Sequence, residues 1–296
     1  MTRNKTNLKG ILAAALAASG FSVSLVSAGF AFRAGADPAT VITFRGLAGL
    51  IIGLIMVRLM TRNLKIPSNA IMPLGLMTLG MITVSFGYMG AIQYIPISLA
   101  TLIFYMFPTV VLIISSLTAR RMPSLLSGLA FFMAFAGLAS ALGVSINGLD
   151  WHGVAWALAA TAGGTLLFFY GSVTAQRTGI ALFIFYSQAA IAGAGVLAMI
   201  SLDGINLPTG TTGAYAFIGI FTGYLVGISM HFFAVRLINP ALAALVFNVE
   251  PVVTISLSAI LLGDILTLSQ YIGGAFVIFG VLLATRLANR MQQPHY

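Results

Sequence analysis

Three ionisable side chains of this sequence lie inside long apolar stretches: Arg45, His231 and Glu250. An ionisable group at the centre of a bilayer costs roughly 2.5–3.5 kcal/mol on insertion scales, so such a residue is a candidate for function. Their types define the chemistry to consider. A carboxylate binds an ammonium group or a proton, a guanidinium binds a carboxylate, and an imidazole exchanges protons near neutral pH.

Glu250 lies about ten residues into an apolar stretch, which is roughly 15 Å along a helix. Pro251 follows it and removes a backbone donor, which loosens the helix at that point. A carboxylate beside a broken helix suits an ammonium ligand or a coupling proton. A structural carboxylate, neutral or paired with an arginine, is an equally good interpretation, and the residues alone leave the two open.

Arg45 lies about seven residues into its own stretch, roughly 10 Å deep. We favour a structural role, in which it snorkels outward or pairs with Asp37 or Glu250; the alternative is a bidentate bond to a substrate carboxylate. His231 fits a neutral, hydrogen-bonded histidine better than a proton carrier. No second histidine is near it in the sequence, so neither a metal site nor a cofactor is expected.

The composition requires a membrane around these residues. Hydrophobic residues make up 59% of the 296-residue chain and charged residues 6%, against about 45–50% and about 25% in soluble domains. The mean hydropathy is +1.05. The net charge of +9 sits in short loops, which argues against a nucleic-acid partner. The absence of cysteine excludes disulfides and thiolate chemistry.

Ten stretches are long enough to span a bilayer as helices, and none alternates as a strand does. The first follows three basic residues and resembles a signal peptide, but its apolar run is too long, so we expect an uncleaved helix. The predicted spans are Gly10–Phe30, Pro38–Arg58, Ala70–Ala91, Ile97–Thr118, Ser124–Ser145, Gly153–Thr174, Gly179–Ile200, Gly213–Arg236, Pro240–Leu262 and Leu268–Ala288.

The charges predict the orientation of these spans. All basic residues except Arg33 and Arg45 fall in loops or ends on the side of the N-terminus. Four of the five acids, all but Glu250, fall in loops on the other side. By the positive-inside rule both termini are cytoplasmic. We expect a multi-pass protein of the cell inner (plasma) membrane.

The chain repeats itself at an offset of 143 residues, as between Gly10 and Gly153 or between Pro108 and Pro251. Each copy has five spans, an odd number, so the second copy enters the membrane from the opposite side. The predicted fold is an all-α integral membrane protein with ten transmembrane helices in two inverted five-helix repeats. Such a chain can open alternately to either side by exchanging the conformations of its halves; a rigid bundle is the alternative.

Segments of the second half carry a family resemblance. They read His231-Phe-Phe-Ala-Val-Arg-Leu-Ile-Asn-Pro240, Ala243-Ala-Leu-Val-Phe-Asn-Val-Glu-Pro251 and Leu261-Leu-Gly-Asp264. With the Pro108 segment and Arg45 of the first half, they resemble the EamA-type transporters of the drug/metabolite transporter superfamily. The resemblance implies two EamA repeats, which we place at residues 10–145 and 153–288, and export or exchange of small metabolites such as amino acids.

Aromatic and polar residues at matched positions of the repeats complete the predicted site. Phe104 and Phe247 each precede the proline of their span by four residues. Arg45 is matched by the uncharged Gln188, which fits a substrate with one charged and one neutral end. Packing in the bundle or against lipid is the ordinary alternative for such aromatics. The predicted substrate-binding residues are Arg45, Tyr88, Phe104, Tyr105, Tyr186, Gln188, His231, Phe247, Asn248 and Glu250, and the predicted hinges are Pro108 and Pro251.

The sequence favours a secondary transporter of small amphipathic solutes that works in export, as a monomer and without a cofactor. A passive channel and an uptake carrier for a vitamin-like metabolite are the alternatives. An enzyme has little support, because one glutamate and one histidine far apart in sequence are not an acid–base pair. Proton coupling and facilitated exchange are both compatible with the residues.

Overall fold

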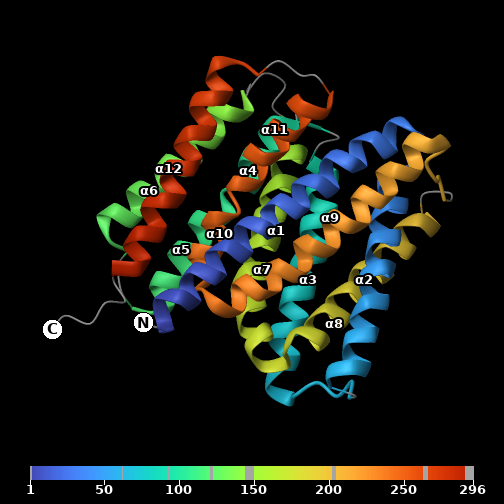
Figure 1. Ribbon diagram of the computed structural model, residues 1–296, viewed down its shortest axis with the longest axis horizontal. Coiled ribbons are helices and arrows are strands. Elements are labelled where there is room, and N and C mark those ends of the chain that lie inside the picture. Colours follow the sequence, from blue (N-terminus) through green and yellow to red (C-terminus); the bar gives the residue numbers. More distant parts are fainter. Residues whose placement is uncertain are drawn as a thin grey trace.

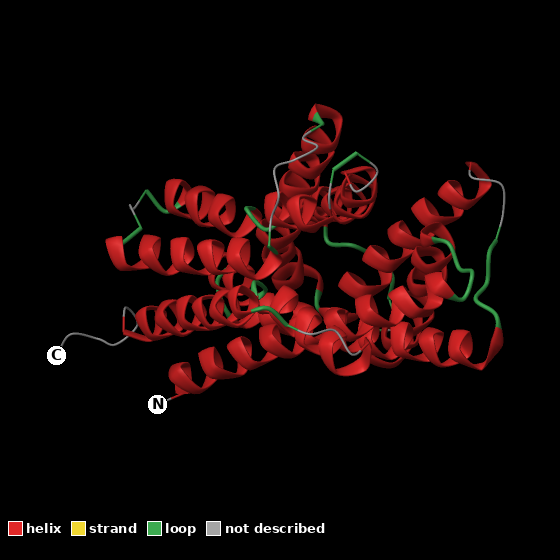
Figure 2. Ribbon diagram, turned by 90° about the horizontal axis from the view of Figure 1, so that it is seen from above, coloured by secondary structure: helices red, strands yellow, loops and turns green. Residues whose placement is uncertain are grey.

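The structure is a computed structural model, and within the residues it describes it contains helices and no strands (Figure 2). The described residues are 2–61, 63–91, 94–95, 97–120, 123–143, 150–201, 205–262 and 266–290. Arg62, Arg121, Asp203 and Asp264, which contributed to the predicted orientation, lie outside them. The helices are α1 Thr2–Arg33, α2 Pro38–Met60, α3 Ser68–Ala91, α4 Ile97–Phe104, α5 Phe107–Thr118, α6 Leu125–Leu142, α7 Trp151–Thr178, α8 Ile180–Ser201, α9 Gly210–Leu237, α10 Pro240–Val246, α11 Val249–Leu262 and α12 Leu268–Arg290.

The described chain holds nine stretches that are long and apolar enough to cross a membrane, and α12 holds a shorter apolar stretch over Leu268–Ala284. These ten segments agree with the ten predicted spans. Helix α1 begins and helix α12 ends at the same end of the bundle (Figures 1 and 2). We call this the N-terminal end and the opposite one the distal end.

Two of the predicted spans are not continuous helices. The fourth consists of α4 and α5 and the ninth of α10 and α11, each with a two-residue break. Pro108 and Pro251 lie in the first turn of the second helix of each pair, where they cannot donate a bond to the carbonyl four residues earlier. The chain tightens instead: the N–H of Asn248 donates to the Leu245 carbonyl, three residues back, at 3.0 Å.

The twelve helices form two sets of six at the predicted offset. Helix α1 packs along α9, and its repeat equivalent α7 packs along α3. Helices α2 and α8 form one edge of the bundle and α6 and α12 the other (Figure 1). Every one of these pairs joins one repeat to the other, so the two halves interlock rather than fold as separate units.

Glycines set the distance between the paired helices. A Cβ atom on Gly20 of α1 would lie 2.7 Å from the backbone nitrogen of Gly227 and 2.8 Å from the carbonyl oxygen of Gly223 in α9. In the other pair, a Cβ atom on Gly163 of α7 would lie 2.8 Å from the carbonyl oxygen of Gly80. Both contacts are backbone against backbone, so a larger residue would force the helices apart.

The two repeats are not in the same conformation. Helix α5 packs against α10, towards the N-terminal end, whereas their repeat equivalents α11 and α4 form no comparable contact in the described chain. Helix α1 also packs more closely along α11 than α7 does along α5. The broken helices therefore meet at the N-terminal end and separate towards the distal end.

Polar groups join the repeats at the distal end. Asp37 caps α2 by accepting a bond from the Thr40 N–H at 2.8 Å, and it accepts another from the Asn206 N–H at 3.2 Å. The Thr209 N–H donates to the Ala34 carbonyl at 2.9 Å. Burial raises the pKa of the Asp37 carboxyl, but the bonds from Thr40 and Asn206 outweigh it, and the pKa lies below its usual value.

Candidate functional site

The candidate site is built where the two broken helices meet. Glu250 lies in the first turn of α11 and is partly exposed. The hydroxyl of Tyr105, in the break of the other span, donates to the Glu250 carboxylate. One hydrogen bond thus joins the two breaks. The backbone of Glu250 is held from α1, where the Ser22 hydroxyl donates to its carbonyl oxygen at 2.9 Å.

A further phenol and a hydroxyl of the first repeat contact each other in the same region. The Tyr88 hydroxyl of α3 lies 2.7 Å from Thr101 Oγ1 of α4. Tyr88 and Tyr105 are both near enough to Glu250 to interact with it electrostatically. A carboxylate among hydroxyl oxygens offers several acceptors to one ammonium group.

Arg45 supplies the opposite charge without forming an ion pair. Its Cζ atom lies 4.3 Å above the centre of the Tyr224 ring, and its Nε is buried without a hydrogen-bond partner. Its charge acts on Glu250, but among the described residues no carboxylate lies within 4.0 Å of the guanidinium nitrogens. The expected pairing with Asp37 or Glu250 is therefore not found, and a cation–π contact takes its place.

Tyr224 also connects Arg45 to its repeat partner. The Tyr224 hydroxyl donates to Gln188 Oε1 at 2.8 Å, and Gln188 is fully buried against Gly49 of α2. A charged and an uncharged group that are equivalent in the repeats thus both contact one tyrosine, the first over its ring and the second at its hydroxyl.

A continuous set of aromatic rings joins the two breaks. Phe168 of α7 lies at its centre, with ring centroids 4.9 Å from Phe107 and 4.9 Å from Phe247. The predicted matched pairs form equivalent edge-to-face contacts on either side: Tyr88 with Phe104 at 6.1 Å, and His231 with Phe247 at 5.1 Å. These rings give the site a rigid apolar wall.

Two predicted residues are buried with unsatisfied polar atoms. His231 is 2% exposed, and neither ring nitrogen has a hydrogen-bond partner in the structure. The expectation of a hydrogen-bonded histidine is therefore not met. Asn248 is 3% exposed, and its Oδ1 is likewise unpartnered. Both lie beside Phe247, one by ring contact and the other in sequence.

Tyr186 is the one predicted site residue that the structure places elsewhere. Its hydroxyl donates to the Leu64 carbonyl at 2.7 Å, in the connection between α2 and α3 at the N-terminal end. There it joins α8 to that connection, and none of its ring contacts is to a residue of the aromatic set. The sequence alone did not reveal this contact, because it joins α8 to a connection that belongs to the other repeat.

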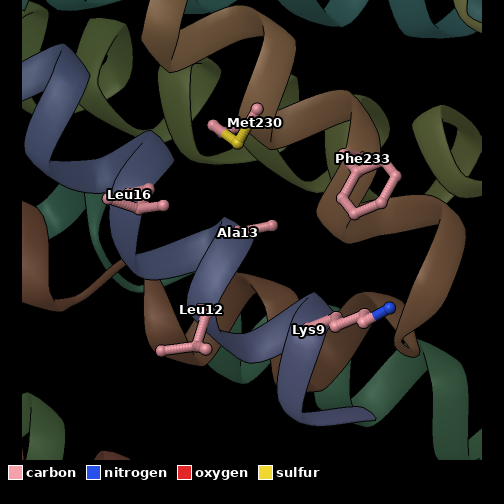
Figure 3. Close-up of a pocket in the computed structure, with 6 residues that line it drawn as sticks. All are labelled: Lys9, Leu12, Ala13, Leu16, Met230 and Phe233. Carbon is pink, nitrogen blue, oxygen red and sulfur yellow. The ribbon is translucent and has the colours of Figure 1, made fainter. Parts of the chain in front are cut away.

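A groove between α1 and α9 is not part of the candidate site. It has a volume of about 270 Å³ and lies near the N-terminal end of α1 (Figure 3). Its lining residues are Lys9, Leu12, Ala13, Leu16, Met230 and Phe233. It holds none of the predicted site residues, and all of its lining residues except Lys9 are apolar, so we do not assign it to the site.

Comparison with known families decides the general class. The profile described as "EamA-like transporter family" matches the chain twice, over residues 8–143 and 151–286. The chain belongs to the EamA-like transporter family. It is therefore a multi-pass membrane protein of a family that transports small solutes and is not enzymatic.

Other comparisons add the fold alone. No curated protein sequence matches the chain significantly. A solved structure titled "Crystal structure of protein" matches with 21% identity and a TM-score of 0.75, over 98% of this chain and 99% of that one. At this identity the match shows that the EamA-like transporter shares its fold with a protein seen by crystallography, and nothing about substrate.

Several residues of the site were not predicted from the sequence. Phe21, Tyr224 and Ser22 connect the predicted residues to one another. Tyr224 had a usable signal, because it follows Gly223 in the small-residue face of α9 that had to meet another helix. Phe21 and Ser22 needed the pairing of helices from different repeats, which one sequence does not reveal.

Proposed function

We propose that this EamA-like transporter is a secondary carrier of small amphipathic solutes that bear both an amino group and a carboxylate, amino acids first among them. The observation that carries the proposal is that a carboxylate and a guanidinium lie in one cluster without forming an ion pair with each other. Glu250 is partly exposed and held by Tyr105, while Arg45 lies over Tyr224 in the same cluster with Nε unpartnered. Each charge is available to one end of a zwitterion, between aromatic walls.

We propose alternating access as the mechanism and export as the direction. The inverted repeats and the different contacts of α5–α10 and α4–α11 support the mechanism, because exchange of these contacts would open the other end. The family resemblance supports export. The asymmetry of Lys and Arg supports cytoplasmic termini in a plasma membrane of bacterial inner-membrane type. One chain encloses the site, which supports a monomer.

The test is counterflow in proteoliposomes preloaded with a mixed pool of amino acids and other metabolites. We expect saturable, solute-selective exchange by the wild type. Glu250→Gln removes the charge but keeps the shape, and we expect exchange to fall about ten-fold or more, as for a lost charged hydrogen bond. A run with an imposed pH gradient separates coupling from binding: accumulation lost while exchange persists makes Glu250 the proton site.

Two outcomes contradict the proposal. Non-saturating leak of the whole pool indicates a channel. Exchange of uncharged or vitamin-like solutes that Glu250→Gln leaves intact indicates a different substrate and removes Glu250 from binding.

A further inference from the structure

The hydroxyl of Ser22 connects α1 to the second broken span, and two carbonyl oxygens lie within its hydrogen-bond distance. Its side chain is fully buried, and its Oγ lies 2.9 Å from the Ala18 carbonyl of its own helix and 2.9 Å from the Glu250 carbonyl of α11. A hydroxyl has one hydrogen to donate. Losing the bond to α11 therefore leaves the hydroxyl satisfied by its own helix, so this contact between helices is inexpensive to break.

The repeat offset assigns a partner to this contact. Thr165 of α7 is equivalent to Ser22, and Phe107 of α5 is equivalent to Glu250. Thr165 is buried, and its hydroxyl donates to the Thr161 carbonyl of its own helix at 2.9 Å. In the described conformation, then, the contact is made in one half of the molecule and the equivalent hydroxyl bonds within its own helix in the other half.

The helix packing shows the same asymmetry. Helix α1 packs closely along α11, whereas its equivalent α7 packs less closely along α5. The hydroxyl contact is present in the closer pair and absent from the looser one. If the halves exchange conformations, α7 approaches α5, and Thr165 comes to the Phe107 carbonyl as Ser22 does now to that of Glu250.

We propose that Ser22 and Thr165 are alternating latches: Ser22 fastens α1 to α11 in the described conformation, and Thr165 fastens α7 to α5 in the exchanged one. This inference rests on the alternating access of the proposed function. Each latch releases to a carbonyl of its own helix, so the exchange leaves no buried hydroxyl unpaired. Both are positioning residues, because they act through the broken helices.

A third hydroxyl makes the two conformations unequal. Thr161 of α7 donates to the Ile103 carbonyl of α4 at 2.7 Å and lies 3.0 Å from the Ala157 carbonyl of its own helix. Its repeat equivalent is Ala18, which has no hydroxyl. In the exchanged conformation the repeat equivalent of this contact cannot form, so the two conformations differ in their contacts between helices.

The absence of cysteine allows a direct measurement. Two pairs of spin labels are introduced by cysteine substitution. The first pair is at Arg33 and Leu261, at the distal ends of α1 and α11. The second pair is at their repeat equivalents Gln176 and Thr118, which are exposed at the N-terminal end. Electron–electron distances are recorded without substrate. Exchange of the halves lengthens the first distance and shortens the second.

We expect Ser22→Ala to raise the ratio of exchanged to described populations about five-fold, the effect of one hydrogen bond. Adding Thr165→Val to Ser22→Ala should reverse this shift. Ser19→Ala is the matched control: Ser19 lies in the same helix, and within the described residues its hydroxyl donates to the Ala15 carbonyl of that helix and not to another helix, so the populations should stay as in the wild type. Ser22→Thr keeps the hydroxyl and should do the same, which separates the latch from general damage to α1.

Equal shifts from Ser19→Ala and Ser22→Ala, or a further shift in the same direction on adding Thr165→Val, would overturn the latches. Counterflow on the same preparations separates the two proposals. If the wild type shows counterflow but the substitutions at Ser22 and Thr165 do not change the label distances, the proposed carrier function is retained and the latches are rejected. If the wild type shows no counterflow and a single distance for each label pair, alternating access is contradicted, and the latches, which depend on it, are rejected as well.

Discussion

Glu250 and Arg45 share one cluster without touching, and this separation has a physical consequence. A direct buried ion pair would have to be broken before either group could bind a ligand, at a cost of several kcal/mol. Instead, Tyr105 makes a hydrogen bond with Glu250, and Tyr224 makes a cation–π contact with Arg45. Such a cation–π contact is worth about 0.5–2 kcal/mol. A zwitterion that replaces these weaker contacts gains two charge-assisted interactions.

This arrangement predicts a division of labour that competition experiments can measure. Three competitors are compared in counterflow: an amino acid, the amine that lacks its carboxylate, and the acid that lacks its amino group. With Arg45→Gln we expect the amino acid to lose its advantage over the amine, about ten-fold in inhibition constant, because the carboxylate has lost its partner. Glu250→Gln should remove the advantage over the acid. If both variants weaken all three competitors equally, the two residues are structural.

Asp37 predicts a pH dependence of stability at the distal end. Its pKa is lowered in the folded chain, so ionised Asp37 stabilises the fold at any pH above its usual value of 3.8. This stabilisation is lost as pH falls below that value and through the folded pKa. We expect Asp37→Asn to lower the thermal midpoint in detergent at pH 7 and the difference from wild type to shrink towards pH 3. A constant difference would show that the carboxylate charge is not involved.

At this scale the sequence identified most of the candidate residues but not their neighbours. Glu250 and Arg45 stood out because ionisable groups are costly in apolar stretches, and Tyr105 because it matches Asn248 in the other repeat and lies near Pro108. Their contacts could not be found, since Tyr105 and Glu250 belong to different repeats, and the position of Tyr224 after Gly223 showed only that its helix face meets another helix, not that it meets Arg45. Tyr186 shows the converse: its residue type suited a cavity, and the fold placed it against a connecting segment.

At the scale of helices, the spans were predictable and their breaks only in part. Length and hydropathy fix where a chain can cross a bilayer. Pro108 and Pro251 marked where a helix loses a bond, but proline also occurs inside the continuous helix α3, as Pro73, so the residue type does not decide between a kink and two helices. The contacts around each break decide it, and these come from the other repeat.

The close glycine contact of α1 with α9 predicts an asymmetry between two glycines of one helix. A Cβ atom on Gly20 would meet backbone atoms of Gly227 and Gly223, which cannot move aside as a side chain does, whereas nothing lies within 4 Å of a Cβ atom on Gly29. We expect Gly20→Ala to destabilise the chain by about 1–3 kcal/mol and to lower its thermal midpoint in detergent by several degrees. Gly29→Ala is the control and should leave the midpoint unchanged or slightly raised, because alanine favours helix. Equal effects would mean that α1 and α9 are not in backbone contact.

At the scale of the whole molecule, inversion of the repeats makes a prediction that no single residue or helix carries. Ser68 begins α3, and its equivalent Thr211 lies in the first turn of α9; both are exposed. They have the same place in their repeats, but an odd number of spans puts them on opposite faces of the membrane. The lack of native cysteine lets a single substitution report each face. With both termini cytoplasmic, an impermeant maleimide added to intact cells should label Thr211→Cys and reach Ser68→Cys only after lysis. The reverse pattern would show that both termini lie on the outer side, and it would still agree with an inverted repeat. Labelling of both from the same side would contradict the inversion itself, and with it the exchange of halves on which alternating access depends.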